Sequence, residues 1–363
     1  MAISGDGSTV VGWSHSQASN ATDRVEAFRW TAAEGMIGLG SLPGGGILSR
    51  AWAVSYDGSV VVGYGQSDIT HAHAARWTID GNVQELGSIN GDLVGSFAYD
   101  VSGDGTRIVG SVASTGSSGD RAVTWNTQGQ AQFVPLIGTD GSRATSISHD
   151  GNVVVGGAHF EVGEETEYNA FLWSQQTGTL KLGDLPGGTH SSLAFRVSAD
   201  GQTVVGRGTS NEGREAFRWT DKDELVSLGV LSGGQHLSEA RGTSEDGSII
   251  VGFSGSAAAS EFYADIPDDD DPPFPKTEAV IWDHQHGMRS LREVLIRDYG
   301  LDLQDWYLRA AMDISDDGRT IAGHGIGPGG YQQAFVVTIP EPAAASLLLL
   351  GGMLMRHRSK TKA

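Results

Sequence analysis

Residues 148–156 read Ser-His-Asp-Gly-Asn-Val-Val-Val-Gly, and the same nine-residue frame, Ser-x-Asp-Gly-x-x-[Val/Ile]-[Val/Ala]-Gly, occurs seven times in this chain of 363 residues. No copy contains an insertion or a deletion, and successive leading serines lie 46 to 71 residues apart. A period of this length is typical of arrays of small β-sheets rather than of two-helix solenoids. The copies span residues 4–12, 55–63, 102–110, 148–156, 198–206, 244–252 and 315–323.

Every frame predicts a β-hairpin. The Asp-Gly pair is a strong turn signal, a short apolar stretch such as residues 51–54 precedes it, and the Val-Val-Gly run follows it. We therefore interpret the aspartates of the frames as structural turn residues. They are Asp6, Asp57, Asp104, Asp150, Asp200, Asp246 and Asp317.

A second signature, Ala-Phe-Arg-Trp, follows each frame in more or less complete form, and Val337 takes the tryptophan position in the last repeat. A recurring core contact requires the same aromatic residue in each repeat, whereas a binding site does not. We therefore predict a structural role for the six tryptophans that occupy this position. They are Trp30, Trp77, Trp125, Trp173, Trp219 and Trp282.

Each period thus holds four short strands: two in the frame, one in the Ala-Phe-Arg-Trp stretch and one that ends in Leu-Gly. Four antiparallel strands repeated around an axis form a β-propeller. We predict an all-β fold in which residues 1–339 form a β-propeller of seven blades, followed by a short hydrophobic tail at 340–363. The seventh repeat stops after its third strand, at residues 334–339, so its blade lacks a fourth.

Length variation is confined to one kind of loop. The spacing from the last glycine of the frame to the tryptophan varies between 13 and 30 residues. In a propeller these loops, between the second and third strands, share one face with the Leu-Pro-Gly-Gly crossovers at 42–45 and 185–188, and the Asp-Gly turns lie on the other face. We expect the loop-rich face to be the contact surface.

Two segments depart from the repeat. Residues 261–276 carry a run of four aspartates and four prolines, and we predict a solvated loop there. Residues 288–298 have apolar residues on one helical face, and a glycine follows, which predicts a short helix.

The formal net charge of −20 argues against a direct role on nucleic acid, because such binding depends on Lys and Arg that neutralise phosphates. Four of the 24 basic residues stand in the last eight positions, so the body is more acidic than the whole chain. The absence of cysteine excludes disulfides, cysteine-ligated metals and a thiol nucleophile.

Few side chains suggest metal binding or catalysis. The pairs His71/His73 and His284/His286 lack a further ligand at zinc-site spacing, and we interpret them as surface histidines. The run 268–271 lacks the ligand spacing of a calcium loop. We predict no metal and no cofactor. No pair of inward-facing carboxylates of the kind that glycosidases use can be singled out, and no nucleophile elbow or P-loop occurs.

The frame, the Ala-Phe-Arg-Trp stretch and the Leu-Gly-x-Leu-Pro-Gly-Gly motif together resemble the HAF family of probable extracellular repeats, over nearly all of residues 1–340. The resemblance implies export and assigns no reaction.

The C-terminal tail is similar to the PEP-CTERM sorting signal of certain Gram-negative bacteria. Its parts are the Pro340-Glu341-Pro342 motif, an apolar run at 343–355, and a basic end with Arg356 and Arg358. This resemblance implies recognition by an exosortase-like enzyme and cleavage near the motif. Thirteen helical residues reach about 20 Å, short of the roughly 30 Å hydrocarbon core, which favours a transient inner-membrane anchor with a cytoplasmic C-terminus.

Export requires an N-terminal signal, yet the chain opens on Met1-Ala2-Ile3 directly before the first frame. We expect the natural start to lie upstream and to encode a signal peptide together with the fourth strand missing from the last blade.

From the sequence we predict an exported, non-catalytic interaction module of the cell envelope or extracellular matrix, located outside a Gram-negative cell. Its expected partners are the exosortase-like enzyme and exopolysaccharide or other surface proteins. The alternatives are a polysaccharide-active hydrolase or lyase with its site in the channel, and a passive structural component of the matrix.

Overall fold

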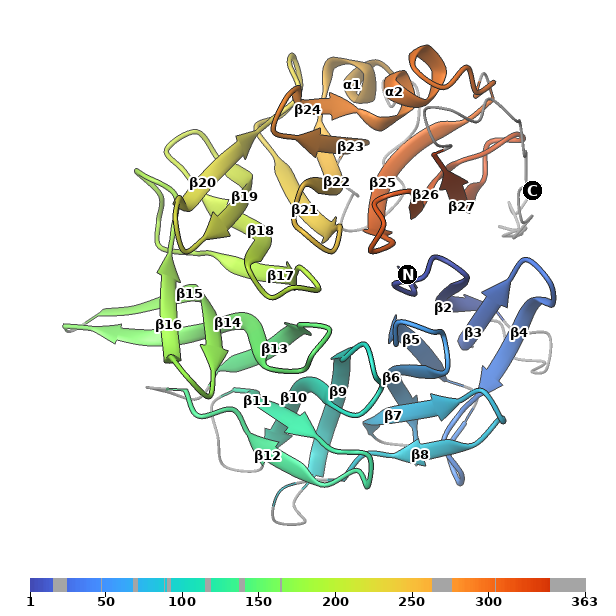
Figure 1. The fold of residues 1–363 in the computed structure, drawn as a ribbon, viewed down its shortest axis with the longest axis vertical. Coiled ribbons are helices and arrows are strands. Elements are labelled where there is room, and N and C mark those ends of the chain that lie inside the picture. Colours follow the sequence, from blue (N-terminus) through green and yellow to red (C-terminus); the bar gives the residue numbers. More distant parts are fainter. Residues whose placement is uncertain are drawn as a thin grey trace, which may run out of the picture.

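The chain folds into seven small antiparallel sheets arranged as blades around one axis, as a computed structural model shows (Figure 1). The structure describes residues 1–15, 25–46, 48–67, 71–87, 89, 93–114, 119–136, 141–163, 165–262, 276–303 and 305–339. Six sheets have four strands, and the seventh has three within these residues. The predicted seven-bladed propeller is therefore confirmed.

Blades 1 to 3 follow the predicted order, with the first strand of each nearest the axis. Blade 1 contains β1 (Ala2–Ile3), β2 (Thr9–His15), β3 (Val25–Thr31) and β4 (Gly35–Gly40). Blade 2 contains β5 (Ser49–Val54), β6 (Val60–Gln66), β7 (Ala72–Thr78) and β8 (Val83–Glu85). Blade 3 contains β9 (Leu93–Val101), β10 (Ile108–Ser114), β11 (Arg121–Trp125) and β12 (Ala131–Phe133).

Blades 4 to 7 repeat this order. Blade 4 contains β13 (Ser142–Ile147), β14 (Val153–Val162), β15 (Glu165–Ser174) and β16 (Gly178–Gly183). Blade 5 contains β17 (Leu193–Val197), β18 (Thr203–Thr209), β19 (Arg214–Thr220) and β20 (Glu224–Gly229). Blade 6 contains β21 (Ser238–Thr243), β22 (Ile249–Gly255), β23 (Thr277–Asp283) and β24 (Gly287–Ser290), and blade 7 contains β25 (Tyr307–Ile314), β26 (Thr320–Ile326) and β27 (Gln332–Thr338).

The serine and aspartate of each frame hold the hairpin turn. In blade 4, Ser148 Oγ donates to Asp150 Oδ1 (2.6 Å) and accepts from the Val153 amide (3.0 Å). Asp150 Oδ1 also accepts from the Asn152 amide (3.0 Å). Equivalent bonds occur in all seven frames. The hydrogen-bonding capacity of these side chains is thus used within the turn.

Backbone hydrogen bonds of 2.9 to 3.2 Å join the seven turns into a closed ring. Each turn donates one amide to a carbonyl of the next blade, and the last blade donates to the first. The donor and acceptor pairs are Asp6 to Tyr56, Tyr56 to Gly103, Gly103 to His149, His149 to Ala199, Asp200 to Glu245, Glu245 to Asp316 and Asp316 to Gly5.

The last glycine of the frame permits a β-bulge in the neighbouring first strand. In blade 3 the register steps from Val109 opposite Asp100 to Gly110 opposite Ala98, which leaves Tyr99 as the extra residue. A Cβ on Gly110 would lie 1.9 Å from the Phe97 carbonyl oxygen. Six of the seven frame glycines face a first-strand carbonyl in this way, at 1.9 to 2.2 Å. The glycine is therefore required by close backbone approach.

The hydrophobic core lies mainly between adjacent blades. One cluster joins Val62 of blade 2 to Ile108 and Trp125 of blade 3, and all three are at most 1% exposed. Each of the six repeated tryptophans belongs to such a cluster or packs against one. Trp77, Trp125 and Trp219 are buried, and Trp30, Trp173 and Trp282 are half-buried.

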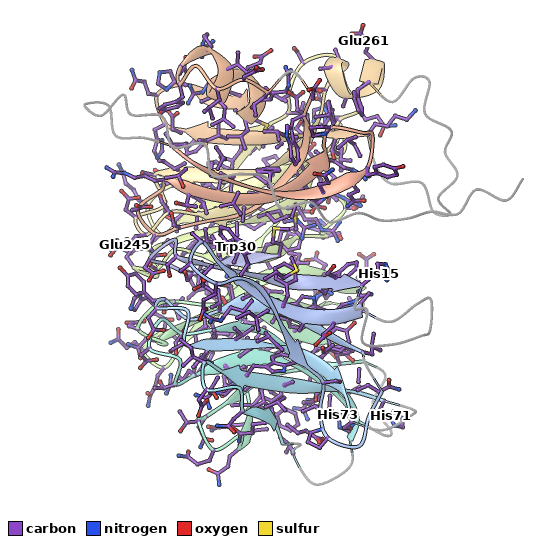
Figure 2. The ribbon with its side chains drawn as sticks, turned by 90° about the vertical axis from the view of Figure 1, so that its right-hand side faces the viewer. His15, Trp30, His71, His73, Glu245 and Glu261 are labelled. Carbon is purple, nitrogen blue, oxygen red and sulfur yellow. The ribbon has the colours of Figure 1, made fainter. Side chains whose placement is uncertain are left out.

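The propeller has two distinct faces. We call the side with the Asp-Gly turns the turn face, and the side with the crossovers and the loops between second and third strands the loop face. In the side view, Glu245 of a turn lies at one face, while His15 and His71 lie at the other (Figure 2). The crossovers pack against the ends of second strands, since a Cβ on Gly188 would lie 1.9 Å from the Thr209 carbonyl oxygen.

Two predicted segments need correction. The predicted helix 288–298 is shorter: Met288 and Arg289 belong to β24, because they pair with Trp282 and Ile281, and α2 spans Leu291–Arg297. The Ser290 side chain caps α2 by accepting from the Glu293 amide. The predicted loop 261–276 begins inside α1 (Ala257–Phe262), and its residues 263–275 lie outside the described part of the chain.

Within the described residues, no helix is long and apolar enough to cross a membrane. The predicted tail, with Pro340, Glu341, Pro342, Arg356 and Arg358, lies outside the described residues.

Candidate functional site

The bulges give each blade one distinctive side chain on its innermost strand. The bulged residue stands three positions before the frame serine and is partly exposed in blades 2 to 7. These residues are Trp52, Tyr99, Thr145, Phe195, Arg241 and Met312. A bulge re-aims a side chain relative to the pleat, so the same backbone device presents a different chemical group in each blade.

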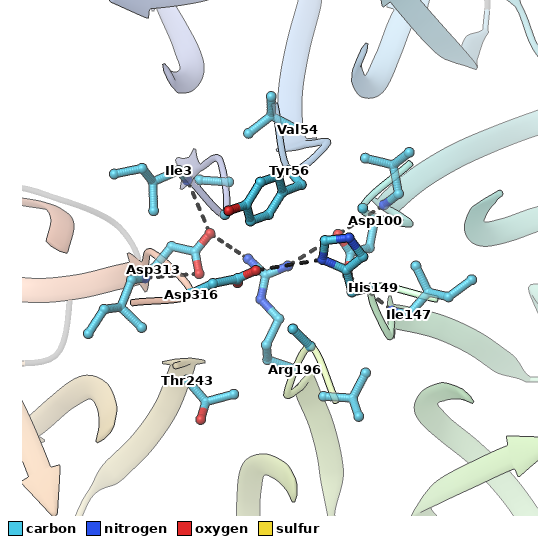
Figure 3. A pocket seen from close by; sticks show the side chains of 17 residues that line it. Ile3, Val54, Tyr56, Asp100, Ile147, His149, Arg196, Thr243, Asp313 and Asp316 are labelled. Atoms are coloured by element: carbon cyan, nitrogen blue, oxygen red, sulfur yellow. Dashed lines mark hydrogen bonds and ion pairs between the residues drawn. The ribbon is translucent and has the colours of Figure 1, made fainter. Parts of the chain in front are cut away.

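A small cavity lies on the axis beneath the ring of turns (Figure 3). Its volume is about 70 Å³, and its acidic and basic lining residues are Asp100, His149, Arg196, Asp313 and Asp316. A space of this size holds a few water molecules.

Arg196 occupies the centre of this cavity. Its guanidinium contacts Asp313 Oδ2 at 2.5 Å and Asp100 Oδ1 at 3.2 Å. Burial alone would lower the pKa of Arg196, but Asp313 and Asp100 outweigh it and raise that pKa above its ordinary value. We call these three residues the axial latch, because they join blades 3, 5 and 7 across the axis.

The carboxylates of the latch also bind the backbone of neighbouring blades. Asp100 Oδ2 accepts from Ser146 Oγ (2.7 Å) and from the Ile147 amide (3.1 Å) of blade 4. Asp313 Oδ2 accepts from the Ile3 amide (3.1 Å) of blade 1. Burial raises the pKa of Asp313, against the opposing effect of Arg196. The latch is therefore a satisfied polar network that connects five blades.

The latch corrects the expectation that no inward-facing carboxylates could be singled out. Asp100 and Asp313 do converge on the axis, although a guanidinium separates them. A signal was present in the sequence: two positions before the frame serine, other blades have small residues such as Ala53 and Gly242. A charged residue at such a position indicates a specific axial role.

Aromatic rings line the axial side of blades 2 and 3, nearer the loop face. Trp52 stacks on Tyr99, with ring centroids 5.1 Å apart and planes 8° from parallel. Phe97 and Tyr64 pack around this pair, at 5.8 and 4.9 Å from Trp52. Burial raises the pKa of both tyrosines. This group is an aromatic wall contributed by strands β5, β6 and β9.

A group of arginines lies across from it, in blades 5 and 6. Arg214 Nη1 and Arg207 Nη1 lie 3.0 and 3.6 Å from Glu239 Oε1, and Arg241 contacts Glu239 Oε2. The Arg241 guanidinium also lies 4.0 Å from the centre of the Phe195 ring. Glu239 is 3% exposed, whereas the three arginine side chains are 29 to 45% exposed. We call Arg207, Arg214 and Arg241 with Glu239 the basic cluster.

The pKa of His324 reflects the positive charge near the basic cluster. Burial and the nearby charges of Arg309 and Arg241 lower its pKa from 6.5 to about 4. Folding therefore favours the neutral imidazole, so the contribution of His324 to stability is complete above pH 6.5 and is lost as the pH falls toward 4.

We expect His324→Gln to reduce the pH dependence of stability. Between pH 7 and pH 4.5 the wild-type chain should lose about 2 to 3 kcal/mol through this histidine, and the variant should not. Urea unfolding at both pH values measures the difference. The same replacement at the exposed His284 is the control for removal of a histidine. Equal pH profiles for wild type and His324→Gln would contradict the assignment.

The paired histidines differ from the prediction in part. His284 and His286 are exposed in a turn, as predicted. His73, in contrast, lies in β7 rather than in a loop, is 9% exposed, and bonds through Nδ1 to Glu85 (2.6 Å) and Ser67 (2.8 Å). The strand begins at Ala72, two residues before the stretch 74–77 that the sequence indicated as a strand. No group of three or more potential metal ligands gathers among the described residues.

No protein-family model and no curated protein matches the chain. Similar solved structures include an oligogalacturonate lyase in complex with manganese, at 14% identity and a TM-score of 0.56, covering 94% of this chain and 88% of that one. The β-propeller domain of the trilobed protease from Pyrococcus furiosus has 8% identity and a TM-score of 0.53, covering 93% of each chain. TolB from Acinetobacter baumannii has 11% identity and a TM-score of 0.49, covering 77% of this chain and 62%, less than two thirds, of its own. At these identities the likeness shows one thing, that the chain is a β-propeller.

Proposed function

We propose that this propeller is an exported, non-catalytic interaction module of the cell envelope or extracellular matrix. The proposal rests on one observation: the turn residues and the bulged residue of each repeat have different roles. The serine and aspartate of the frame are consumed by the turn, whereas the bulged residue beside the axis differs from blade to blade. A binding scaffold combines a backbone that repeats from blade to blade with exposed side chains that differ between the blades.

The same proposal includes sorting through the C-terminal tail. An exosortase-like enzyme recognises Pro340 to Pro342, the apolar run crosses the inner membrane transiently, and the propeller is released outside a Gram-negative cell. The likeness of residues 340–363 to a PEP-CTERM signal supports this step.

Fractionation of cells that carry the native gene, complete or without the codons for residues 340–363, tests the sorting step. We expect the full chain to reach the surface or medium and the shortened chain to remain in the periplasm or the inner membrane fraction. Identical distributions of the two chains would contradict sorting by the tail.

A polysaccharide-active enzyme is the second candidate, and one observation favours it: Asp100 and Asp313 both reach the axis. Arg196 lies between them and contacts both, so the space that a scissile glycosidic bond would need between the two carboxyl groups is filled by a guanidinium. Incubation of the purified chain with acidic and neutral polysaccharides, followed by measurement of reducing ends and of unsaturated products, separates the candidates. If the wild-type chain forms product and the Asp313→Asn variant does not, the protein is an enzyme and not a non-catalytic binding module.

A further inference from the structure

The basic cluster carries more positive charge than its single carboxylate can neutralise. Three guanidinium groups share Glu239, and the described residues supply no other carboxylate within ion-pair distance of Arg207, Arg214 or Arg241. Mutual repulsion is visible in Arg207, whose pKa is lowered by burial and by Arg214 and Arg241 in spite of Glu239. A group of cations held together in this way is prepared to accept further anions.

Arg143 extends the positive region toward blade 4. Its Nε donates to the Tyr168 hydroxyl (3.2 Å), and no carboxylate of the described residues pairs with it. Arg143 is close enough to Arg207 to lower the pKa of that residue further. The positive region thus runs along the axial side of three consecutive blades, in a protein whose net charge is −20.

Flat apolar surfaces stand at the same level as these arginines. Phe195 lies against Arg241, and the bulged residues Trp52 and Tyr99 occupy the equivalent position in blades 2 and 3. Arg50 belongs to the same side and lies 4.4 Å from the ring centre of Trp13, which is 42% exposed. Rings of this kind accept the apolar face of a cyclic ligand, while arginines orient its anionic groups.

We propose that the basic cluster, together with Arg143 and the aromatic residues Phe195, Trp52 and Tyr99, binds an acidic polysaccharide through the carboxylates of its uronic acid residues. The proposal rests on the binding role proposed above and names its ligand class. Glu239 shows the geometry: it is a carboxylate already held by guanidinium groups from strands β18, β19 and β21. A ligand carboxylate that reaches the exposed ends of these arginines meets the same donors.

The small number of cations favours an acidic glycan held through a few of its carboxylates over a nucleic acid. Nucleic acid binding depends on the neutralisation of many closely spaced phosphates, and the acidic body of this protein repels such a ligand. The basic cluster and Arg143 together contain four cations and one carboxylate. This excess of positive charge is enough to bind a few ligand carboxylates.

Binding of polygalacturonate to the full chain tests the inference, with methyl-esterified polygalacturonate as the neutral counterpart. We expect affinity for the acidic polymer at least tenfold above that for the ester, and weaker binding as salt rises. The double variant Arg207→Gln/Arg241→Gln should lose at least tenfold in affinity for the acid and little for the ester. Arg218→Gln is the matched control, because Arg218 is an ion-paired arginine of blade 5 that pairs with Asp223 instead of Glu239.

A conservative second variant guards against misfolding. Phe195→Leu keeps an apolar side chain at the bulge and should weaken binding several-fold while the salt dependence stays as in wild type. Thermal unfolding of each variant shows that the propeller is intact.

Four outcomes would overturn the inference: no binding of polygalacturonate, equal binding of the ester, equal or tighter binding of a single-stranded oligonucleotide, or no effect of the double variant. Binding of a neutral glycan alone would overturn the ligand class and leave the binding role standing. Turnover of any glycan would instead remove the non-catalytic role, so the two proposals fail separately.

Discussion

Replacement of Arg196 by methionine is expected to lower the free energy of unfolding by about 3 to 5 kcal/mol at pH 7. The substitution leaves Asp100 and Asp313, both 5% exposed, without the cation that compensates them. The loss should shrink toward pH 4, because an uncompensated buried carboxylate takes up a proton more readily. Urea unfolding at both pH values measures it.

Two further variants show whether the charge of the latch is the cause. Arg29→Met removes a guanidinium whose partner, Glu34, is 51% exposed, and should change stability by less than about 1 kcal/mol. The triple variant Asp100→Asn/Arg196→Met/Asp313→Asn removes both charges left unpaired and should recover part of the loss. An Arg196→Met chain as stable as wild type would contradict the axial latch as a source of stability.

Gly110→Ala should destabilise the propeller by about 3 kcal/mol or more. The added methyl group would overlap a backbone atom, which cannot move aside as a flexible side chain can. The new Cβ would lie 1.9 Å from the Phe97 carbonyl oxygen and 2.9 Å from the Trp125 ring. Relief requires the bulge at Tyr99 to be lost, and loss of the bulge would turn Tyr99 away from Trp52. Chemical unfolding, with tryptophan fluorescence as a second probe, follows both effects.

Gly95→Ala is the matched control in the same blade. Its Cβ would meet only the Ala72 carbonyl oxygen, at an ordinary 3.5 Å, and its φ is not in the left-handed region. We expect a change of less than about 1 kcal/mol there, since glycine within a strand is itself slightly unfavourable. Equal stability of the two alanine variants would show that close backbone approach does not explain the frame glycine.

The fold could be predicted from the sequence because each blade is specified locally. The frame contains the turn residues and the second strand within nine positions, so its repetition reveals the number of blades and the two faces. The segment 288–298 shows where local pattern fails. Met288 fits an amphipathic helix by spacing, but pairing with Trp282 across a short turn places it in a strand.

The axial features could not be derived in the same way, because they depend on residues far apart in the chain. Asp100, Arg196 and Asp313 meet only after five blades have brought their inner strands together. The basic cluster likewise joins Arg207 and Arg214 to Glu239 of the next blade. The available signal was a charged residue at an inner-strand position where other blades have a small or apolar one. The sequence did not show which of these charged residues lie close together in space.

The ring of backbone hydrogen bonds between the Asp-Gly turns has a consequence for connectivity. Each turn donates one amide to the next turn, from the second frame position in five blades and from the frame aspartate in blades 1 and 5, and the bond from Asp316 to Gly5 joins the last blade to the first. The hydrogen bonds at the turn face would therefore be the same whichever blade came first in the chain. A circular permutant that opens the chain between two other blades would form the same ring of backbone hydrogen bonds.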